Sequence, residues 1–294
     1  MTKEHRLAGQ GAILLCAVLW STSGLFIKLV DWNPVVIAGS RSLIAAIFLL
    51  GIRFFSRRRF RASKPNRVRR EIFLTAAGGC NYAATMILFV IANKLTASAN
   101  VILLQYTSPV WAALLGWLFI REKPHWEQWG ALGMVSLGMF LIFKNGLEAG
   151  GLLGDCLALV SGFTFGANSV IMRTQKDGSP MDVMLAAHII CALFSIPFVI
   201  RYPPLPGTGN ILCILFMGIF QIGAASALFA YGIKRIPAVQ ALLTAMIEPV
   251  LNPVWVLVIT GEKPAVPALI GGGIIAAAVL LSSLIGVSTS RRHS

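Results

Sequence analysis

The sequence predicts an all-α integral membrane protein with ten transmembrane helices arranged as two inverted five-helix repeats. Three observations lead to this fold class: an apolar composition, ten apolar runs of membrane-spanning length, and an internal repeat. Of the 294 residues, 56% are hydrophobic and only 12% are charged, and the mean hydropathy is +0.77. Soluble domains carry about 25% charged residues, because they must cover their surface in water. The composition therefore excludes a soluble enzyme.

The ten apolar runs approach the length that a bilayer requires, which is about 20 residues for a helix. Most connections between the runs are short and contain Pro, Gly, Asn or Asp, which favour turns. The expected spans cover residues 8–30, 34–53, 71–92, 96–119, 126–144, 150–172, 181–200, 209–232, 237–260 and 264–287.

The net charge of +14 is concentrated in the connections between the spans. With the N-terminus placed inside, most Lys and Arg residues fall on the inner side, above all in the basic stretch 53–70. This distribution follows the positive-inside rule, so both termini are expected in the cytoplasm and the chain in the cytoplasmic (inner) membrane. The stretch 53–70 is expected to attract anionic lipid, and no nucleic-acid partner is expected.

The chain also repeats itself at a constant spacing, as Pro109 and Pro249 illustrate. A fixed offset over a long segment indicates duplicated structural units. We therefore expect two repeats, residues 1–146 and 147–294, with five spans each. Because five is odd, the repeats cross the membrane in opposite senses, an arrangement found in secondary transporters. The matching pairs are Gly78/Gly218, Ala84/Ala224, Leu88/Leu228, Phe89/Phe229, Lys94/Lys234, Leu103/Leu243, Pro109/Pro249, Val110/Val250, Glu122/Glu262, Lys123/Lys263, Pro124/Pro264 and Gly133/Gly273.

A further set of sequence features is typical of one family of membrane proteins. The set comprises Trp20 with the following Lys28, Arg41-Ser42, the segments from Pro109 to Glu122 and from Pro249 to Glu262, and the glycine-rich fifth and tenth spans. With these features the chain resembles the EamA family of the drug/metabolite transporter superfamily. The resemblance covers residues 9–144 and 150–286, nearly the whole chain. It implies a ten-helix carrier that works by alternating access, and members of that family mostly export amino acids and other small metabolites.

Three ionisable residues are expected at membrane depth, where each is costly and calls for an explanation. Glu248 precedes Pro249, which leaves the carbonyl of Ala245 without its helical donor, and it could bind a cationic group or cycle a proton. Arg41 could hold a substrate carboxylate or act as a fixed counter-ion for Glu248. His188 lies where an inverted repeat would place the partner of Arg41 and could couple transport to protons. For each residue the alternative is a structural role.

A set of aromatic and amide side chains is expected to surround these residues. Amides and phenols that face lipid would lack hydrogen-bond partners, so they should face protein or a wet cavity. Phe163 lies at the position that matches Trp20 in the second repeat. A midplane cavity for a small amphiphilic molecule is favoured, and helix packing is the alternative. The set comprises Trp20, Asn81, Tyr82, Gln105, Tyr106, Trp111, Gln221 and Asn252.

The function expected from these features is that of a secondary transporter, an exporter of a small amino-acid-like or amine-bearing metabolite. The helix bends at Pro109 and Pro249 are expected to gate the site. No nucleotide-binding Gly-x-x-x-x-Gly-Lys-Ser/Thr motif occurs, and no cofactor or metal is expected. Proton coupling and facilitated exchange both remain open, as do a monomer and a homodimer. The alternative is a membrane-embedded lipid-handling protein or enzyme.

Overall fold

A computed structural model gives the architecture of the chain. It describes residues 3–55, 65–96, 98–124, 126–143, 151–175, 179–204, 206–251, 255 and 266–288. These residues form helices, turns and loops, and no strand occurs among them, so the predicted all-α class is confirmed.

The helices of the first half follow the expected spans closely. They are α1 (Lys3–Trp20), α2 (Ser23–Leu29), α3 (Pro34–Phe55), α4 (Pro65–Leu95), α5 (Ser98–Gln105), α6 (Ser108–Ile120) and α7 (Trp126–Phe143).

The second half contains one segment of π-helix, labelled η1, within a long apolar run. Its elements are α8 (Leu152–Thr174), α9 (Pro180–Arg201), α10 (Thr208–Phe216), η1 (Met217–Ala224), α11 (Ala225–Ile233), α12 (Ala238–Ala245) and α14 (Val266–Ser288).

Seven of the expected spans are long and apolar enough to cross a membrane within the described residues. Two further apolar helices, Ala238–Leu251 and Leu269–Leu281, are shorter. The chain is therefore a multi-pass membrane protein, and the full count of ten stays a prediction. The seven spans are Glu4–Ile27, Pro34–Phe55, Arg69–Leu95, Asn100–Ile120, Leu152–Thr174, Pro180–Arg201 and Thr208–Ile233.

The fourth and ninth spans are interrupted just before their prolines, as the sequence predicts. The helix opens at Tyr106–Thr107, and α6 then starts at Ser108-Pro109. The matching turn occupies Met246–Ile247, directly before Glu248-Pro249. Proline has no N–H to donate to the carbonyl four residues earlier, so the ladder of helical hydrogen bonds is broken at the same point in each repeat.

Two further interruptions have no proline and are not predicted by the apolar pattern. The first span breaks at Ser21–Thr22, where the Ser21 hydroxyl donates to the carbonyl of Val18 (2.7 Å) and the Thr22 hydroxyl to that of Leu19 (2.8 Å). Such bonds compete with regular helical pairing. The eighth span passes through η1, and π-helical turns occur frequently at functional sites.

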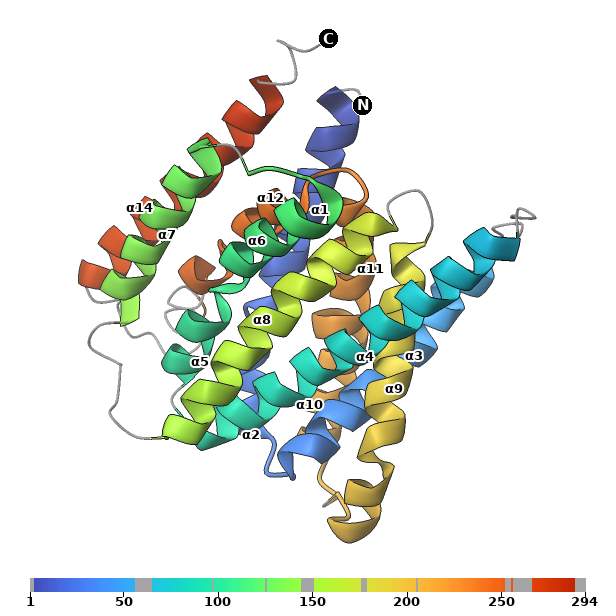
Figure 1. Cartoon of the computed structure of the whole chain (residues 1–294). Coiled ribbons are helices and arrows are strands. Elements are labelled where there is room, and N and C mark those ends of the chain that lie inside the picture. Colours follow the sequence, from blue (N-terminus) through green and yellow to red (C-terminus); the bar gives the residue numbers. More distant parts are fainter. Residues whose placement is uncertain are drawn as a thin grey trace.

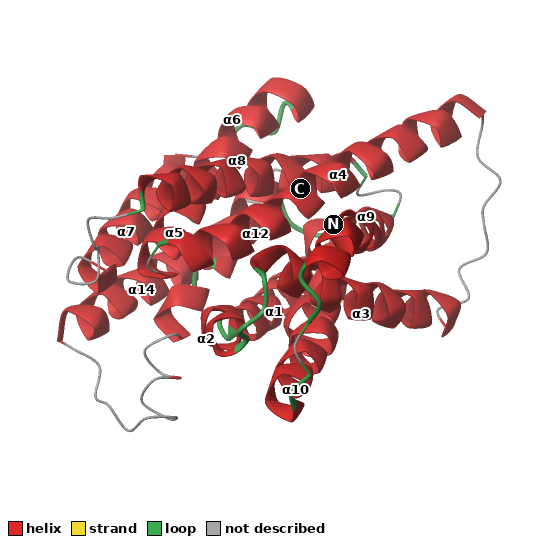
Figure 2. Cartoon of the chain, turned by 90° about the horizontal axis from the view of Figure 1, so that it is seen from below, coloured by secondary structure: helices red, strands yellow, loops and turns green. Residues whose placement is uncertain are grey.

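The helices pair across the two halves in a reciprocal way. The pair α7 and α14 lies on one side of the bundle and the pair α3 and α9 on the opposite side, and the long helix α4 runs across from α9 to α8 (Figures 1 and 2). Between them α4 packs on α8, α1 packs on α11, and α6 packs on α12. The contact of α4 with α8 is thus mirrored by that of α11 with α1, as a two-fold axis between the halves would produce. The start of α1 and the end of α14 both lie at the top of the view in Figure 1.

Candidate functional site

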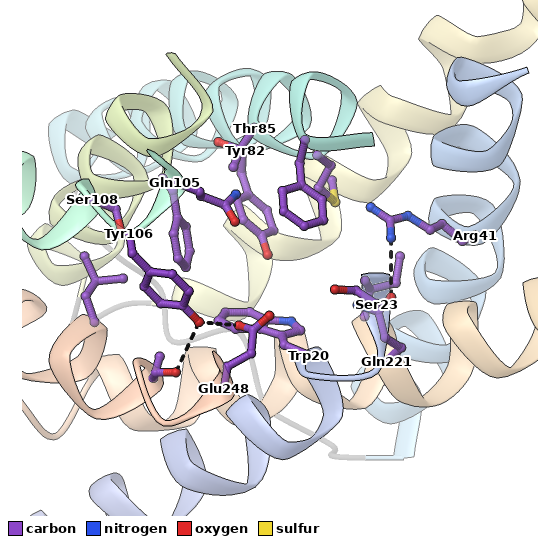
Figure 3. A pocket seen from close by; sticks show the side chains of 16 residues that line it. Trp20, Ser23, Arg41, Tyr82, Thr85, Gln105, Tyr106, Ser108, Gln221 and Glu248 are labelled. Atoms are coloured by element: carbon purple, nitrogen blue, oxygen red, sulfur yellow. Dashed lines mark hydrogen bonds between the residues drawn. The ribbon is translucent and has the colours of Figure 1, made fainter. Parts of the chain in front are cut away.

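A small cavity lies where the helices of the two halves meet, with a volume of about 70 Å³. Figure 3 shows side chains from both halves pointing into it. One water needs about 10–15 Å³ of such a cavity, and pockets for small-molecule ligands usually measure about 300–1,000 Å³. The cavity therefore holds a few waters but no metabolite of ordinary size. Its lining is Trp20, Ser23, Arg41, Tyr82, Thr85, Met86, Phe89, Gln105, Tyr106, Ser108, Phe165, Gln221, Ile222, Leu242, Ala245 and Glu248.

One side of the cavity carries the carboxylate of Glu248. The Tyr106 hydroxyl donates to Glu248 Oε2 over 2.7 Å and also lies 3.5 Å from the carbonyl oxygen of Ala245 (Figure 3). That carbonyl is the one that Pro249 deprives of its helical donor. The two proline-linked interruptions thus face each other, because Tyr106 comes from the first repeat and Glu248 from the second. The sequence predicted both residues as site residues but not their contact.

The opposite side carries the guanidinium of Arg41, which projects from α3. Its Nη1 donates to Gln221 Oε1 over 3.4 Å (Figure 3). Gln221 lies on η1, and the neighbouring Gly218 packs so closely on α3 that an added Cβ would lie 3.0 Å from the backbone oxygen of Arg41. The π-helical segment and its glycine therefore bring the amide to the guanidinium.

Arg41 and Glu248 do not form an ion pair with each other. Ion pairs join Arg53 to Asp182 and Arg173 to Glu122, and neither Arg41 nor Glu248 takes part in them. The alternative that Arg41 acts as a fixed counter-ion for Glu248 is therefore not supported by a direct ion pair between them. The two charges instead mark separate sides of the cavity, with Trp20 between them in Figure 3.

Aromatic rings form the middle of the site. The Trp20 ring lies 5.5 Å from that of Phe165 and 5.4 Å from that of Phe229, measured between centroids. The Tyr82 ring lies 6.1 Å from that of Phe165. Phe163, which matches Trp20 in the repeat pattern, is 41% exposed, and its ring lies 5.3 Å from that of Trp111. Phe165, two residues further along α8, lies on the face of that helix that meets Trp20.

Seven predicted site residues line the cavity: Trp20, Arg41, Tyr82, Gln105, Tyr106, Gln221 and Glu248. Three others lie outside its lining. His188 is buried behind Tyr82, with its Nε2 2.9 Å from the Ser226 hydroxyl. Asn81 donates to the carbonyl of Thr164 over 2.5 Å, and Trp111 packs on Phe163.

Three predicted residues remain, namely Asn252, Pro109 and Pro249. Asn252 lies outside the described residues. Pro109 and Pro249 do not line the cavity; they stand just after the two helix interruptions that form part of its wall.

Some cavity residues were not predicted, and periodicity could have found one of them. Thr85 follows Tyr82 by three residues on α4 and therefore shares its face. Its hydroxyl bonds to that of Thr164 over 2.8 Å and to the backbone of Asn81 over 3.1 Å. Ser23 and Ser108 line the cavity because the helices break beside them, and no pattern in the sequence indicates the break at Ser21–Thr22.

The groups that line the cavity are suited to the recognition of a solute. It presents one carboxylate, one guanidinium, amides, hydroxyls and ring faces, and no group of His, Cys, Asp and Glu able to hold a metal occurs among the described residues. Such a set can orient a small charged solute by hydrogen bonds and by ring–cation contacts.

Comparison with known proteins agrees with this interpretation. The family model described as the EamA-like transporter family matches residues 7–144 and 152–284, in two separate segments. A solved crystal structure covers 97% of this chain and 99% of its own, with a TM-score of 0.78 at 18% identity, and so shows the same fold.

Three curated relatives carry transporter names. An uncharacterised transporter from Archaeoglobus fulgidus is 25% identical over 279 residues, covering 93% of this chain and 96% of the relative. The human solute carrier family 35 member G1 is 27% identical over 231 residues, covering 71% and 61%. An S-adenosylmethionine/S-adenosylhomocysteine transporter from Chlamydia muridarum is 30% identical over 138 residues, covering 46% and 42%. The family and its relatives are named as transporters and not as enzymes, and the chain belongs to the EamA-like transporter family.

Proposed function

We propose that the protein is a secondary transporter that exports a small amino-acid-like or amine-bearing metabolite, and that the central cavity is its substrate site. The observation that carries this proposal is the carboxylate of Glu248, held by Tyr106 over 2.7 Å and facing an aromatic cavity between the two halves. A carboxylate beside ring faces is suited to an ammonium group, which both attract.

The names of the relatives support this substrate class in part. The Chlamydia muridarum relative is named for S-adenosylmethionine and S-adenosylhomocysteine, and both molecules carry an amino group. That relative matches over less than half of this chain, so we take from it only the amine, not the whole substrate.

The mechanism that we propose is alternating access between the halves 1–146 and 147–294. In this proposal the two halves have inverted orientations in the cytoplasmic (inner) membrane, and both termini lie in the cytoplasm. The cavity of about 70 Å³ is too small for a metabolite, so the substrate requires a more open state. The interruptions before Pro109 and Pro249 lie in its wall and supply the bends at which α6 and the segment after α12 can move.

The test is uptake of labelled amino acids and amines into proteoliposomes containing the full-length protein, with and without a pH gradient. Glu248→Gln keeps the size of the side chain and removes its charge, so we expect it to abolish transport of amine-bearing solutes while the protein still folds. Glu127→Gln, a change in the first turn of α7 away from the cavity, is the matched control and should transport normally.

The outcomes separate the alternatives. Transport by the Glu248→Gln variant at the wild-type rate would show that the role of Glu248 is structural. Failure of the wild-type protein to move any amino acid or amine, combined with movement of a labelled lipid, would favour the lipid-handling alternative. If a pH gradient drives uptake, His188→Gln then tests whether the buried imidazole beside Ser226 takes part in proton coupling.

A further inference from the structure

Arg41 is a buried guanidinium that lacks an anionic partner. The residue is 2% exposed, and its hydrogen bond in the structure is the one from Nη1 to Gln221 Oε1, at 3.4 Å. Its Nε has no partner among the described residues. A guanidinium offers five N–H donors, and a separation of 3.4 Å exceeds the usual range for a hydrogen bond. Most of the donor capacity of Arg41 is therefore unused.

This state is unfavourable, because arginine stays charged at any physiological pH. A buried charge normally persists only where a partner compensates it. Glu248 does not compensate Arg41, since its carboxylate bonds to Tyr106 on the other side of the cavity (Figure 3). Residues that are unfavourable for stability are often retained where function needs them.

We propose that Arg41, together with Gln221, is an anion subsite of the central cavity, and that the transported solute carries a carboxylate there. This inference rests on the proposed function and narrows its substrate class. The solute is then a zwitterion, with its carboxylate at Arg41 and its ammonium group at Glu248. An amine without a carboxylate leaves Arg41 unpaired and is a poor substrate.

The chemistry of the subsite favours a carboxylate. The planar fork of a guanidinium matches the two oxygens of a carboxylate, and such paired, charge-assisted bonds are among the strongest in proteins. Gln221 accepts from Arg41 through Oε1, which leaves its NH₂ group as a further donor. One guanidinium and one carboxylate also balance a zwitterion charge for charge.

The binding test uses the purified full-length protein and two sets of four compounds. The first set is leucine, leucinamide, isoamylamine and N-acetylleucine, and the second is the corresponding phenylalanine set. We expect the amino acid of at least one set to bind, and its amide and its amine to bind on the order of 100-fold more weakly, since they lack the partner of a buried charge. Equal affinity of the amino acid and its amine would overturn the inference.

Variants of Arg41 connect that preference to the subsite. Arg41→Met should abolish the preference for the amino acid over the amine, and Arg41→Lys, which keeps the charge without the planar fork, should weaken amino-acid binding only partly. Arg70→Met, at an exposed position on α4, is the control and should bind as wild type. Retention of the full preference in Arg41→Met would contradict the proposal.

A stability measurement decides the role of Arg41 even without a ligand. If Arg41 is an anion subsite that is unpaired in the absence of substrate, the Arg41→Met variant should unfold in detergent at the same temperature as the wild type or at a higher one. A marked drop in that temperature would show that Arg41 serves the fold and would overturn the inference. Failure of every compound to bind the wild type overturns the proposed amino-acid or amine function instead, whatever the stability result.

Discussion

Two buried arginines, Arg41 and Arg173, have opposite surroundings. Arg173, 8% exposed, lies in the last turn of α8. Its Nε donates to Glu122 Oε1 over 2.8 Å, and its Nη1 donates to the carbonyls of Ile233 (3.1 Å) and Lys234 (3.2 Å). Arg41 is buried more deeply, yet has only the 3.4 Å contact with Gln221. The comparison shows that burial alone does not reveal what an arginine does; its partners do.

Arg173 acts as a link between three segments. It joins the end of α8 to the connection between α6 and α7 and to the end of α11. The carbonyls at a helix C-terminus lack helical donors and carry partial negative charge, so a cation there is favourable. The link therefore ties both halves of the chain at the end of the bundle where α8 and α11 finish.

The largest effect is expected from Arg173→Met. It leaves Glu122 without its partner and two carbonyls without a donor. We expect a loss of about 3 kcal/mol, at the low end for breaking a buried pair because the Glu122 side chain is 31% exposed. Thermal unfolding in detergent measures it, with Arg41→Met in parallel. Equal stability of Arg173→Met and Arg41→Met would remove the contrast between the two residues.

A smaller effect is expected from Glu122→Gln. The amide keeps an oxygen that accepts from Arg173 but loses the charge, and the pair is partly open to solvent. We expect a loss of about 1 kcal/mol in the same unfolding experiment. Combined with Arg173→Met, the two losses should not add, because both variants remove one interaction. Additive losses would mean that Glu122 stabilises the protein through another contact.

The smallest effect on stability is expected from Tyr106→Phe, on the side of the cavity opposite Arg41. It removes the hydroxyl that bonds to Glu248 and keeps the ring, at a cost of about 1 kcal/mol or less. Transport should slow without being abolished, because the carboxylate stays in place. A Tyr106→Phe variant as inactive as Glu248→Gln would show that the hydroxyl itself is essential for transport.

The sequence predicted the two helix interruptions beside the cavity better than the side-chain contacts within it. A proline removes one helical hydrogen bond, and Pro109 and Pro249 located both interruptions without any tertiary information. Proline alone does not decide the outcome, because α9 continues through Pro197. The Trp20–Phe165 contact was not predicted, since an alignment of repeats does not fix the rotation of a helix about its axis. The π-helical segment Met217–Ala224 leaves no mark in an apolar pattern, although it brings Gln221 to Arg41.

What the sequence determined by itself follows from local physics. Apolar length and scarce charge embed the chain in a membrane, the constant spacing defines two repeats, and the prolines place the interruptions beside Tyr106 and Glu248. Only the tertiary structure decided which polar groups meet. The contact of Arg41 with Gln221 and that of Arg173 with Glu122 join residues far apart in the chain, and such partners depend on how helices rotate and pack. An ionisable residue in an apolar helix indicates that a hydrogen-bonding or oppositely charged partner is needed. Only the packing of the helices shows whether the protein supplies that partner.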